Sequence, residues 1–363
     1  MLLALLALAV WVYLATAHGR FWSSLPELGQ VPPATGAAVD VIVPARDEAD
    51  TIERVIASLR SQDYRGEFKI TLVDDNSSDD TAALAARAGG IDVLRLADKP
   101  AGWSGKLWAL SQGVAATRAP LILFADADIV HHPGHLSSLV AKLDCDSRDM
   151  VSEMVRLHCV STAEKALIPA FVYFFQMLYP FSRVNSRSSR VAAAAGGTIL
   201  IRREILKRVG GMETIRHTLI DDVALATEVK RKGAIYLGHS GLASSIRLYP
   251  RWRDIWQMVA RTAFTQLRFS TALLVATVLA MMLIWLVPPL VAIFGTGAPR
   301  WIGIATCAIA AATYQPTLAR FRCNPAWAAL LPLIALFYLG ATMDSARQHW
   351  LGRGANWKSR SYD

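Results

Sequence analysis

The sequence predicts an α/β fold, with a mostly parallel sheet in the middle of the chain and transmembrane helices at its N-terminal and C-terminal ends. Short apolar runs alternate with helical stretches between Val39 and Tyr249, the pattern of a parallel sheet covered on both faces. The chain is 53% hydrophobic, and the apolar excess lies at its two ends. Only 18% of its 363 residues are charged, below the roughly one quarter found in soluble domains.

The alternating elements can be assigned in order along the middle of the chain. Strands are expected at 39–43, 69–73, 93–96 and 121–124, and helices at 52–59, 81–87, 107–116 and 223–232. In such sheets ligands bind beyond the carboxyl ends of the strands. The residues that follow each strand are therefore the first candidates for a functional site.

The N-terminal apolar segment, 2–17, is slightly shorter than the roughly 20 residues that cross a bilayer. No Lys or Arg precedes it and Arg20 follows it, which favours an uncleaved anchor with the following domain on the cytoplasmic side. The alternative is a cleaved signal peptide, because Ala15-Thr16-Ala17 resembles a cleavage site.

The C-terminal region contains three further candidate spans, at 271–294, 301–313 and 326–343. Basic residues place both the connection around Arg320 and the tail after residue 344 in the cytosol. Three spans would put the tail on the opposite side. Either the segment that contains Pro288-Pro289 is a re-entrant or split helix, or the charge rule fails here.

These observations divide the chain into six segments. The segment 251–270 is expected to be an amphipathic helix in the membrane interface, with an ordinary surface helix as the alternative. The full division is an anchor at 1–22, a linker at 23–38, a catalytic domain at 39–250, the interfacial helix at 251–270, transmembrane helices at 271–344 and a basic cytosolic tail at 345–363.

Net charge and cysteine content restrict the partners and the compartment. The formal net charge of +9 suits a surface that rests on anionic lipid headgroups. We expect no nucleic-acid partner, because no basic run interleaved with aromatics and no zinc or helix-turn-helix pattern is present. The four cysteines form no CxxC pair, which favours reduced thiols over a disulfide framework.

Acidic and polar residues follow three of the expected strands. Pro44-Ala45-Arg46-Asp47-Glu48 follows the first, 74–81 includes Asp75 after the second, and Asp126-Ala127-Asp128 follows the fourth. There is no GxGxxG fingerprint and no P-loop, which disfavours a nicotinamide dehydrogenase. Without such a cradle, a cation has to bridge the carboxylates to a diphosphate, and carboxylates select Mg²⁺ or Mn²⁺.

In order and spacing, VIVPARDE, VDDNSSDDT and Asp126-Ala127-Asp128 resemble the motifs of family 2 glycosyltransferases of the GT-A (Rossmann-like) fold. The resemblance implies that Asp75 contacts the nucleotide base, and that Asp126 and Asp128 hold the ribose and the metal-bound diphosphate. It implies a nucleotide-sugar donor, with UDP-linked glucose or N-acetylglucosamine as the expected donor, and a metal on Asp128 and Asp126. The residues assigned to the nucleotide-sugar are Pro44, Arg46, Glu48, Asp75, Lys106, Asp126 and Arg261.

Residues 102–109 resemble the GWxGKxWA stretch of bacterial lipid and carotenoid glycosyltransferases. Lys106 in this stretch offers a point charge for the diphosphate, or is a solvated lysine that opens a helix. With its apolar ends and its closing segment 357–362, the chain most resembles bacterial hopene-associated glycosyltransferases, and more distantly ceramide glucosyltransferase. Many membrane members carry (Gln/Arg)-x-x-Arg-Trp; here Arg261 stands in for the arginine and the tryptophan is missing, which weakens the alternative of a processive polysaccharide synthase.

Asp221-Asp222 resembles the acidic pair of the family, usually Glu-Asp, and implies catalytic roles for both residues, with Asp222 as the base. The alternative for Asp222 is a cap at the start of the helix 223–232. The apolar segment 166–181 is expected to line the route of a lipid hydroxyl, with a buried core helix as the alternative. The residues assigned to the acceptor are Trp103, Gly196, Gly197, Phe174 and Phe175.

The sequence as a whole therefore predicts an inverting glycosyltransferase that moves one sugar to a membrane lipid hydroxyl, with a hopanoid suggested by the resemblance. The resemblance places it in the bacterial inner membrane as a multi-pass protein, with the catalytic domain on the cytoplasmic face. Besides the processive synthase, a non-catalytic membrane scaffold on a transferase fold is the remaining alternative.

Overall fold

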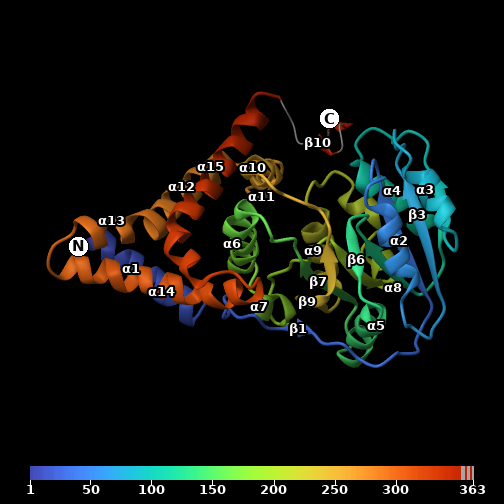
Figure 1. Cartoon of the computed structure of the whole chain (residues 1–363), viewed down its shortest axis with the longest axis horizontal. Helices are drawn as coiled ribbons and strands as arrows, with labels where there is room; N and C mark the ends of the chain where they lie inside the picture. Colours follow the sequence, from blue (N-terminus) through green and yellow to red (C-terminus); the bar gives the residue numbers. More distant parts are fainter. Residues whose placement is uncertain (353–355, 358–359, 362–363) are drawn as a thin grey trace. The chain divides into compact units, whose positions relative to one another are not determined.

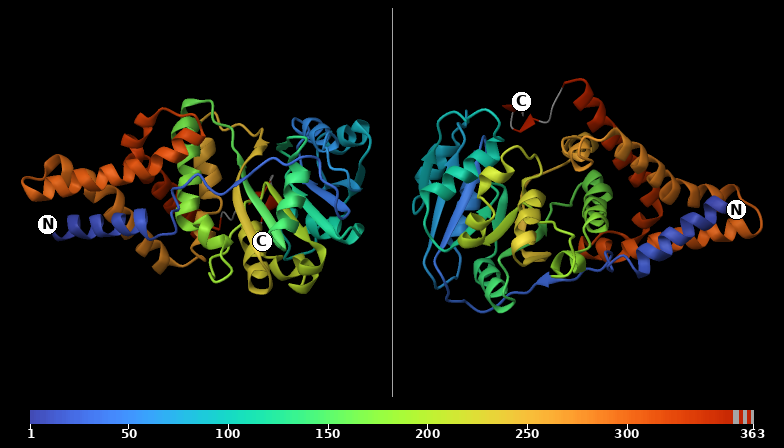
Figure 2. Two further views of the ribbon diagram at one scale, coloured as in Figure 1. Left: turned by 90° about the horizontal axis from the view of Figure 1, so that it is seen from below. Right: turned by 180° about the vertical axis from the view of Figure 1, so that it is seen from behind.

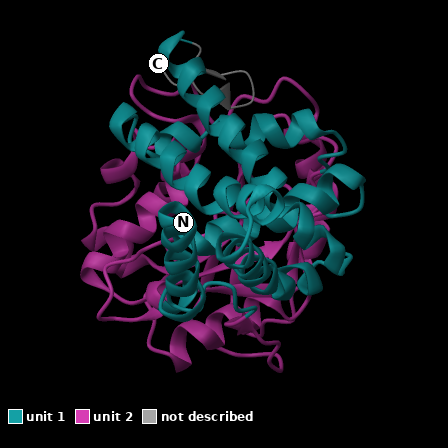
Figure 3. Ribbon diagram, turned by 90° about the vertical axis from the view of Figure 1, so that its left-hand side faces the viewer, with its two compact units in different colours: residues 1–24, 159–182, 248–355 teal, residues 25–158, 183–247, 356–363 magenta. Residues whose placement is uncertain are grey.

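The computed structural model describes residues 1–352, 356–357 and 360–361 and divides into two compact units (Figure 3). The helical unit comprises residues 1–24, 159–182 and 248–355. The sheet unit comprises residues 25–158, 183–247 and 356–363. The chain thus enters and leaves each unit several times. The basic tail expected at 345–363 falls partly on 353–355, 358–359 and 362–363, which lie outside the described residues.

The sheet unit contains one mixed sheet in the order β1-β9-β7-β8-β5-β2-β3-β4, with β6 paired to β9 (Figures 1 and 2). Strands β2, β3, β4 and β5 are parallel to their neighbours in this group, whereas β8 runs antiparallel to both β5 and β7. The mostly parallel sheet that the sequence predicts is confirmed. The strands are β1 (Glu27–Leu28), β2 (Val39–Ala45), β3 (Phe68–Asp74), β4 (Asp92–Arg95), β5 (Leu121–Ala125), β6 (Ile129–His131), β7 (Met150–Arg156), β8 (Thr198–Arg202) and β9 (Ile235–Ser245).

Helices cover both faces of the sheet because successive side chains of a strand point to opposite faces. Val41 and Val43 of β2 belong to the same core cluster as the buried residues of α2. Ile42 faces the other way, toward α4, where a Cβ on Gly113 would lie only 2.5 Å from its Cγ2 atom. Glycine at position 113 therefore lets α4 pack directly on the strand. The helices of this unit are α2 (Ile52–Arg60), α3 (Thr81–Ala88), α4 (Gly105–Ala116), α5 (His135–Cys145), α8 (Arg203–Arg208), η1 (Met212–Ile215) and α9 (Asp221–Lys232).

The helical unit brings together three distant segments of the chain. Its first helix, α1, lies beside α14 in both views of Figure 2. Helix α7 (Phe181–Asn185) lies where the chain passes from this unit to the sheet unit. The elements of the helical unit, apart from α7, are α1 (Leu2–Thr16), α6 (Thr162–Leu178), α10 (Trp252–Ala260), α11 (Ala263–Gln266), α12 (Thr271–Met281), η2 (Met282–Leu286), α13 (Val287–Phe294), α14 (Ala298–Arg320), η3 (Pro325–Leu330) and α15 (Leu331–Trp350).

Three helical stretches among the described residues are long and apolar enough to cross a membrane: Thr271–Phe294, Ala298–Arg320 and Pro325–Trp350. Helix α1, with 15 residues, is a shorter apolar helix. The interfacial segment 251–270, for which a single helix was expected, instead forms the two short helices α10 and α11. Three such helices leave the direction of the tail in conflict with the charge rule, as the sequence already indicated.

The segment around Pro288-Pro289 is one continuous helix of 24 residues rather than two separate pieces. A turn of π-helix, η2, precedes the prolines, and such turns accommodate irregularities within α-helices. Proline has no N–H, so the carbonyl of Ile284, four residues before Pro288, loses its usual donor. The indole Nε1 of Trp11 donates to this carbonyl over 2.9 Å, so α1 satisfies a polar group that the proline leaves without a partner.

Candidate active site

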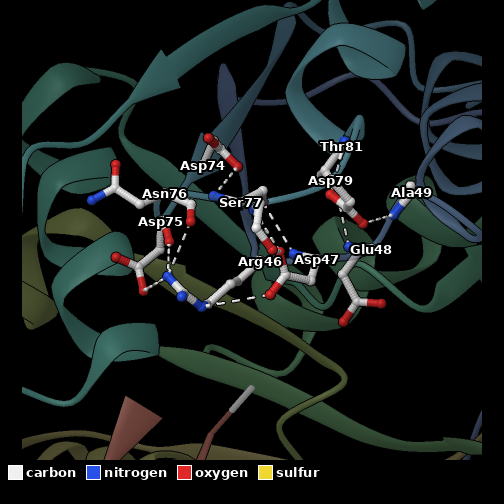
Figure 4. Close-up of polar contacts among 11 residues, drawn as sticks. Arg46, Asp47, Glu48, Ala49, Asp74, Asp75, Asn76, Ser77, Asp79 and Thr81 are labelled. Atoms are coloured by element: carbon white, nitrogen blue, oxygen red, sulfur yellow. Dashed lines mark hydrogen bonds and ion pairs between the residues drawn. The ribbon is translucent and has the colours of Figure 1, made fainter. Parts of the chain in front are cut away.

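The loops that follow β2 and β3 are held together by side-chain bonds (Figure 4). Oδ1 of Asp47 accepts from the backbone N–H of Ser78 over 2.7 Å, and the N–H of Asp47 donates to the Ser77 hydroxyl over 3.0 Å. Asp47 and Asn76 both have positive φ, 51° and 53°, a backbone conformation that concentrates at functional sites. The two loops thus form one structured edge at the carboxyl ends of the sheet.

Arg46 and Asp75 face each other across this edge. Asp75 is fully buried, and its Oδ2 atom lies 3.9 Å from Nη1 of Arg46. The same nitrogen donates to the backbone carbonyl of Asn76 over 3.2 Å. A buried carboxylate offers hydrogen-bond acceptors, and the guanidinium beside it offers donors. Together they can bind a planar, polar ligand such as a nucleotide base.

The side chain of Lys106 joins the end of β5 to the start of α9. Its Nζ atom lies 2.9 Å from Oδ1 of Asp126 and 3.2 Å from Oδ2 of Asp221. Burial by itself would lower the pKa of Lys106, but Asp126, Asp221 and Asp222 together raise it, so the ammonium stays charged. Ser104 caps the helix that carries this lysine by accepting from the N–H of Leu107 over 3.2 Å. The alternative of a freely solvated lysine is wrong, because Lys106 is held between two carboxylates.

Two carboxyl groups around Lys106 have raised pKa values. Burial, followed by the negative charge of Asp221, raises the pKa of Asp222 to about 7. Burial raises the pKa of Asp126 to about 6, although the lysine opposes this change. Asp222 therefore has a pKa close to neutrality, which suits a general base.

Asp222 does not cap the helix α9. The N-cap is Ile220, and Asp222 lies inside the first turn, where its Oδ1 accepts from the N–H of Val223 over 2.7 Å. The cap prediction is therefore wrong. The other carboxylate oxygen of Asp222, Oδ2, would lie 3.2 Å from a Cβ added to Gly196. Nζ of Lys106 would lie 3.5 Å from this Cβ. The absence of a side chain at Gly196 leaves the space between Asp222 and Lys106 open.

Arg247 was not expected from the sequence. Its Nε donates to Oδ2 of Asp128 over 2.6 Å, and its Nη2 to Oε1 of Glu48 over 3.0 Å. Arg247 follows β9, which pairs in parallel with β7. Ligands bind beyond the carboxyl ends of parallel strands, so assigning this strand from the sequence would have pointed to Arg247.

The carboxylates at the end of β5 suit a divalent cation. Asp126 and Asp128 supply hard oxygen ligands, and positive groups already lie against both of them. The described residues contain no group of three or more His, Cys, Asp or Glu side chains placed to hold a metal by themselves. Mg²⁺ is usually bound by one or two carboxylates together with substrate phosphates and water.

The remaining assigned residues fall into two groups. In the sheet unit, the carbonyl of Gly197 accepts from the N–H of Asp126 over 3.1 Å, and Trp103 is buried with its ring 5.4 Å from that of Trp108. Phe174, Phe175 and Arg261 belong to the helical unit, so their roles stay predictions. One cavity in the sheet unit is lined by Lys106, by the three carboxylates around it and by the adjoining side chains: Pro44, Lys106, Leu107, Leu110, Phe124, Asp126, Gly196, Ile199, Met212, Ile215, Asp221, Asp222 and Leu225.

Comparison with known proteins finds glycosyltransferases that are similar to part of this chain. An uncharacterized glycosyltransferase of Mycobacterium tuberculosis is 35% identical over 109 residues, which are 30% of this chain and 45% of that protein. The beta-monoglucosyldiacylglycerol synthase of Trichormus variabilis is 24% identical over 246 residues, 61% of this chain and 51% of that protein. The chain thus matches only about half of the length of these relatives.

The fold has a solved counterpart. The mannosyltransferase PcManGT of Pyrobaculum calidifontis, solved in complex with GDP-Man and Mn²⁺, superposes with a TM-score of 0.54 at 18% identity, over 96% of this chain and 99% of that one. The sequence profile described as Glycosyl transferase family 2 matches residues 40–210, the segment that carries the strand-end carboxylates. Residues 40–210 of this chain are therefore similar to family 2 glycosyltransferases, and its α/β fold is the GT-A fold.

Proposed function

We propose that the chain is a metal-dependent, inverting glycosyltransferase that moves one sugar from a nucleotide-sugar to a lipid hydroxyl in a membrane. The observation that carries this proposal is the position of Lys106, which contacts Asp126 on one side and Asp221 on the other. A donor-side carboxylate and the acidic pair with the base therefore lie around one point. For a sugar bound there, the leaving diphosphate would be within reach of one side of the site, and the attacking acceptor hydroxyl would be within reach of the other.

The reaction is a direct displacement at the anomeric carbon. The acceptor hydroxyl oxygen forms a bond to this carbon while the bond from the carbon to the diphosphate oxygen breaks. Asp222 accepts the hydroxyl proton, and the nucleoside diphosphate leaves with the electron pair of the broken bond. Attack from the side opposite the leaving group inverts the anomeric configuration.

The negative charge of the leaving diphosphate needs a positive partner. Lys106 has a fixed charge beside Asp126 and would stabilise the departing oxygens electrostatically. A Mg²⁺ or Mn²⁺ ion bound by Asp128 and Asp126 would supply Lewis-acid stabilisation of the same diphosphate. Arg46 and Asp75 would bind the nucleotide base, with a UDP-sugar as the preferred donor class.

A lipid acceptor is supported by the apolar helices of the helical unit. Three helices in the described part of the chain have the length and apolarity to cross a membrane, and the net charge of +9 favours anionic lipid surfaces. One relative is named as a synthase of a glucosylated diacylglycerol, which is a membrane lipid. We place the catalytic domain on the cytoplasmic face of a bacterial inner membrane, and include hopanoids among the acceptors to test.

The test is a donor and acceptor screen on the full chain in detergent or nanodiscs. UDP- and GDP-sugars are incubated with a total bacterial lipid extract and with a purified hopanoid, with and without Mn²⁺, and the products are read by mass spectrometry. We expect a mass increment of one sugar on one lipid class, dependent on metal and absent in Asp222→Asn. Nucleotide binding without any lipid product would retain the donor site and reject the lipid acceptor.

A further inference from the structure

Arg247 connects two carboxylates that belong to different loops, Asp128 after β5 and Glu48 after β2. We propose that Arg247 is an internal counter-ion, which occupies the cation position of Asp128 until a metal arrives and competes with the metal for this carboxylate. The inference rests on the proposed function, because that function places the metal on Asp128.

The backbone fixes Arg247 in this position. The N–H of Ile246 donates to the carbonyl of Asp128 over 2.9 Å, and β6 pairs antiparallel with the end of β9. The residue after Ile246 is therefore always close to Asp128, whatever its side chain does. Backbone hydrogen bonds therefore place Arg247 next to Asp128, and their proximity does not depend on the conformations of two flexible side chains.

The two carboxylates need a positive partner when no metal is present. The side chains of Glu48 and Asp128 are only 13% and 14% exposed, and two partly buried negative charges without a cation would be costly. The Arg247 side chain is 35% exposed, which leaves it a path into solvent. It can therefore hold the carboxylates in the free enzyme and withdraw when a stronger cation binds.

Competition of this kind has a consequence for the order of binding. A metal ion alone has to displace a guanidinium from Asp128 and gains only carboxylate and water ligands. A metal that arrives with a nucleotide diphosphate also gains phosphate oxygens, and the added negative charge gives Arg247 a new partner. We therefore expect weak binding of free Mn²⁺ and strong binding of Mn²⁺ in the presence of UDP.

The test measures Mn²⁺ binding by electron paramagnetic resonance on the full chain in detergent, without nucleotide and at low salt. Arg247→Gln should bind Mn²⁺ about three- to tenfold more tightly than the wild type, the range expected when one partly exposed ion pair is lost. Arg247→Lys keeps the charge and should stay within about twofold of the wild type. With saturating UDP, the difference between Arg247→Gln and the wild type should shrink.

Arg202→Gln is the matched control. The Arg202 side chain is 34% exposed and pairs with Asp144 over 2.6 Å in the same unit, so its loss changes the net charge equally but not the site. Unchanged or weaker Mn²⁺ binding in Arg247→Gln would overturn the proposal, as would equal tightening in Arg202→Gln. If Asp128→Asn leaves Mn²⁺ binding unaltered, the metal assignment of the proposed function fails, and the counter-ion role fails with it.

A structure of the wild type with Mn²⁺ and UDP gives an answer that does not depend on how the variants fold. We expect Arg247 to have left hydrogen-bond distance of Asp128 in that complex. A bond between Arg247 and Asp128 that persists beside bound Mn²⁺ would show that the two cations do not compete.

Discussion

The cluster around Lys106 and the cluster around Arg247 each bring one cation against several carboxylates, and they differ in how tightly the cation is held. Lys106 lies among Asp126, Asp221 and Asp222, and its side chain is 20% exposed. Arg247 lies between Asp128 and Glu48 with 35% of its side chain exposed. The lysine cluster has the larger excess of negative charge, and burial raises the pKa values of Asp126 and Asp222 in it.

The difference separates two tasks. Around Lys106 the lysine is fixed and a nearby acid is adjusted to exchange a proton near neutral pH. Around Arg247 the cation has the more exposed side chain and is the group that can leave. The first arrangement suits chemistry on a bound sugar, and the second suits the admission of a metal.

The largest effect should come from the base. Asp222→Asn removes the proton acceptor and should lower the rate of sugar transfer by about 10²- to 10⁴-fold. Nucleotide binding, measured by calorimetry with UDP and Mn²⁺, should stay within a few-fold of the wild type. Transfer at an undiminished rate would mean that another group takes the proton.

Lys106→Gln should have the next largest effect. Loss of the charge beside the leaving diphosphate should lower kcat by about 10²- to 10³-fold. Arg247→Gln should reduce kcat much less at saturating Mn²⁺, because the metal then takes its place. Steady-state assays check this. An equal loss of kcat in Lys106→Gln and Arg247→Gln would mean that the two cations do not have different tasks.

The pH dependence of transfer should report Asp222. The base acts only when deprotonated, and its pKa is raised to about 7, so the rate should fall as the pH drops below about 7. Asp221→Asn removes one cause of the raised pKa, and the acidic limb should move to lower pH. A pH–rate profile of kcat/KM for both proteins checks this, and an unmoved limb would contradict the assignment.

The smallest effect should come from the glycines beside the lysine cluster. A Cβ in Gly196→Ala would lie 3.2 Å from Asp222 and should lower kcat a few-fold by displacing the base, of the order expected for a tight contact. Gly197→Ala is the control, because its Cβ would meet Val155 and Ile129 at 3.3 to 3.4 Å and no charged group. A greater loss of kcat in Gly197→Ala than in Gly196→Ala would indicate general distortion of the loop.

The sequence predicted the parts of the site that are local to a strand end. Asp75, Asp126 and Asp128 follow apolar runs, and parallel strands bring such positions to one edge. It did not predict which cation meets which carboxylate. The pairing of Lys106 with Asp221 joins residues 115 positions apart (221 − 106) through tertiary packing, and periodicity carries no information about such a contact.

Two further features, Arg247 and the proline-containing helix of the helical unit, also depend on contacts that the sequence pattern does not reveal. Arg247 was missed because the strand before it, β9, was not assigned, and no motif marks a single arginine. The two prolines at 288 and 289 left a split helix as one of two alternatives, whereas the helix continues through them with a π-turn and a bond from Trp11. In both cases the decisive partner lies far away in the chain.

The bond between Trp11 and the carbonyl of Ile284 spans 273 positions of the sequence, which has a consequence for biosynthesis. The first helix leaves the ribosome long before the residue whose carbonyl it satisfies has been translated. Until then its indole N–H has no such partner, and the Ile284 carbonyl, which the proline deprives of its usual donor, is costly to bury without one. The N-terminal helix is therefore part of the fold of the helical unit, which completes its assembly only when Trp11 meets Ile284.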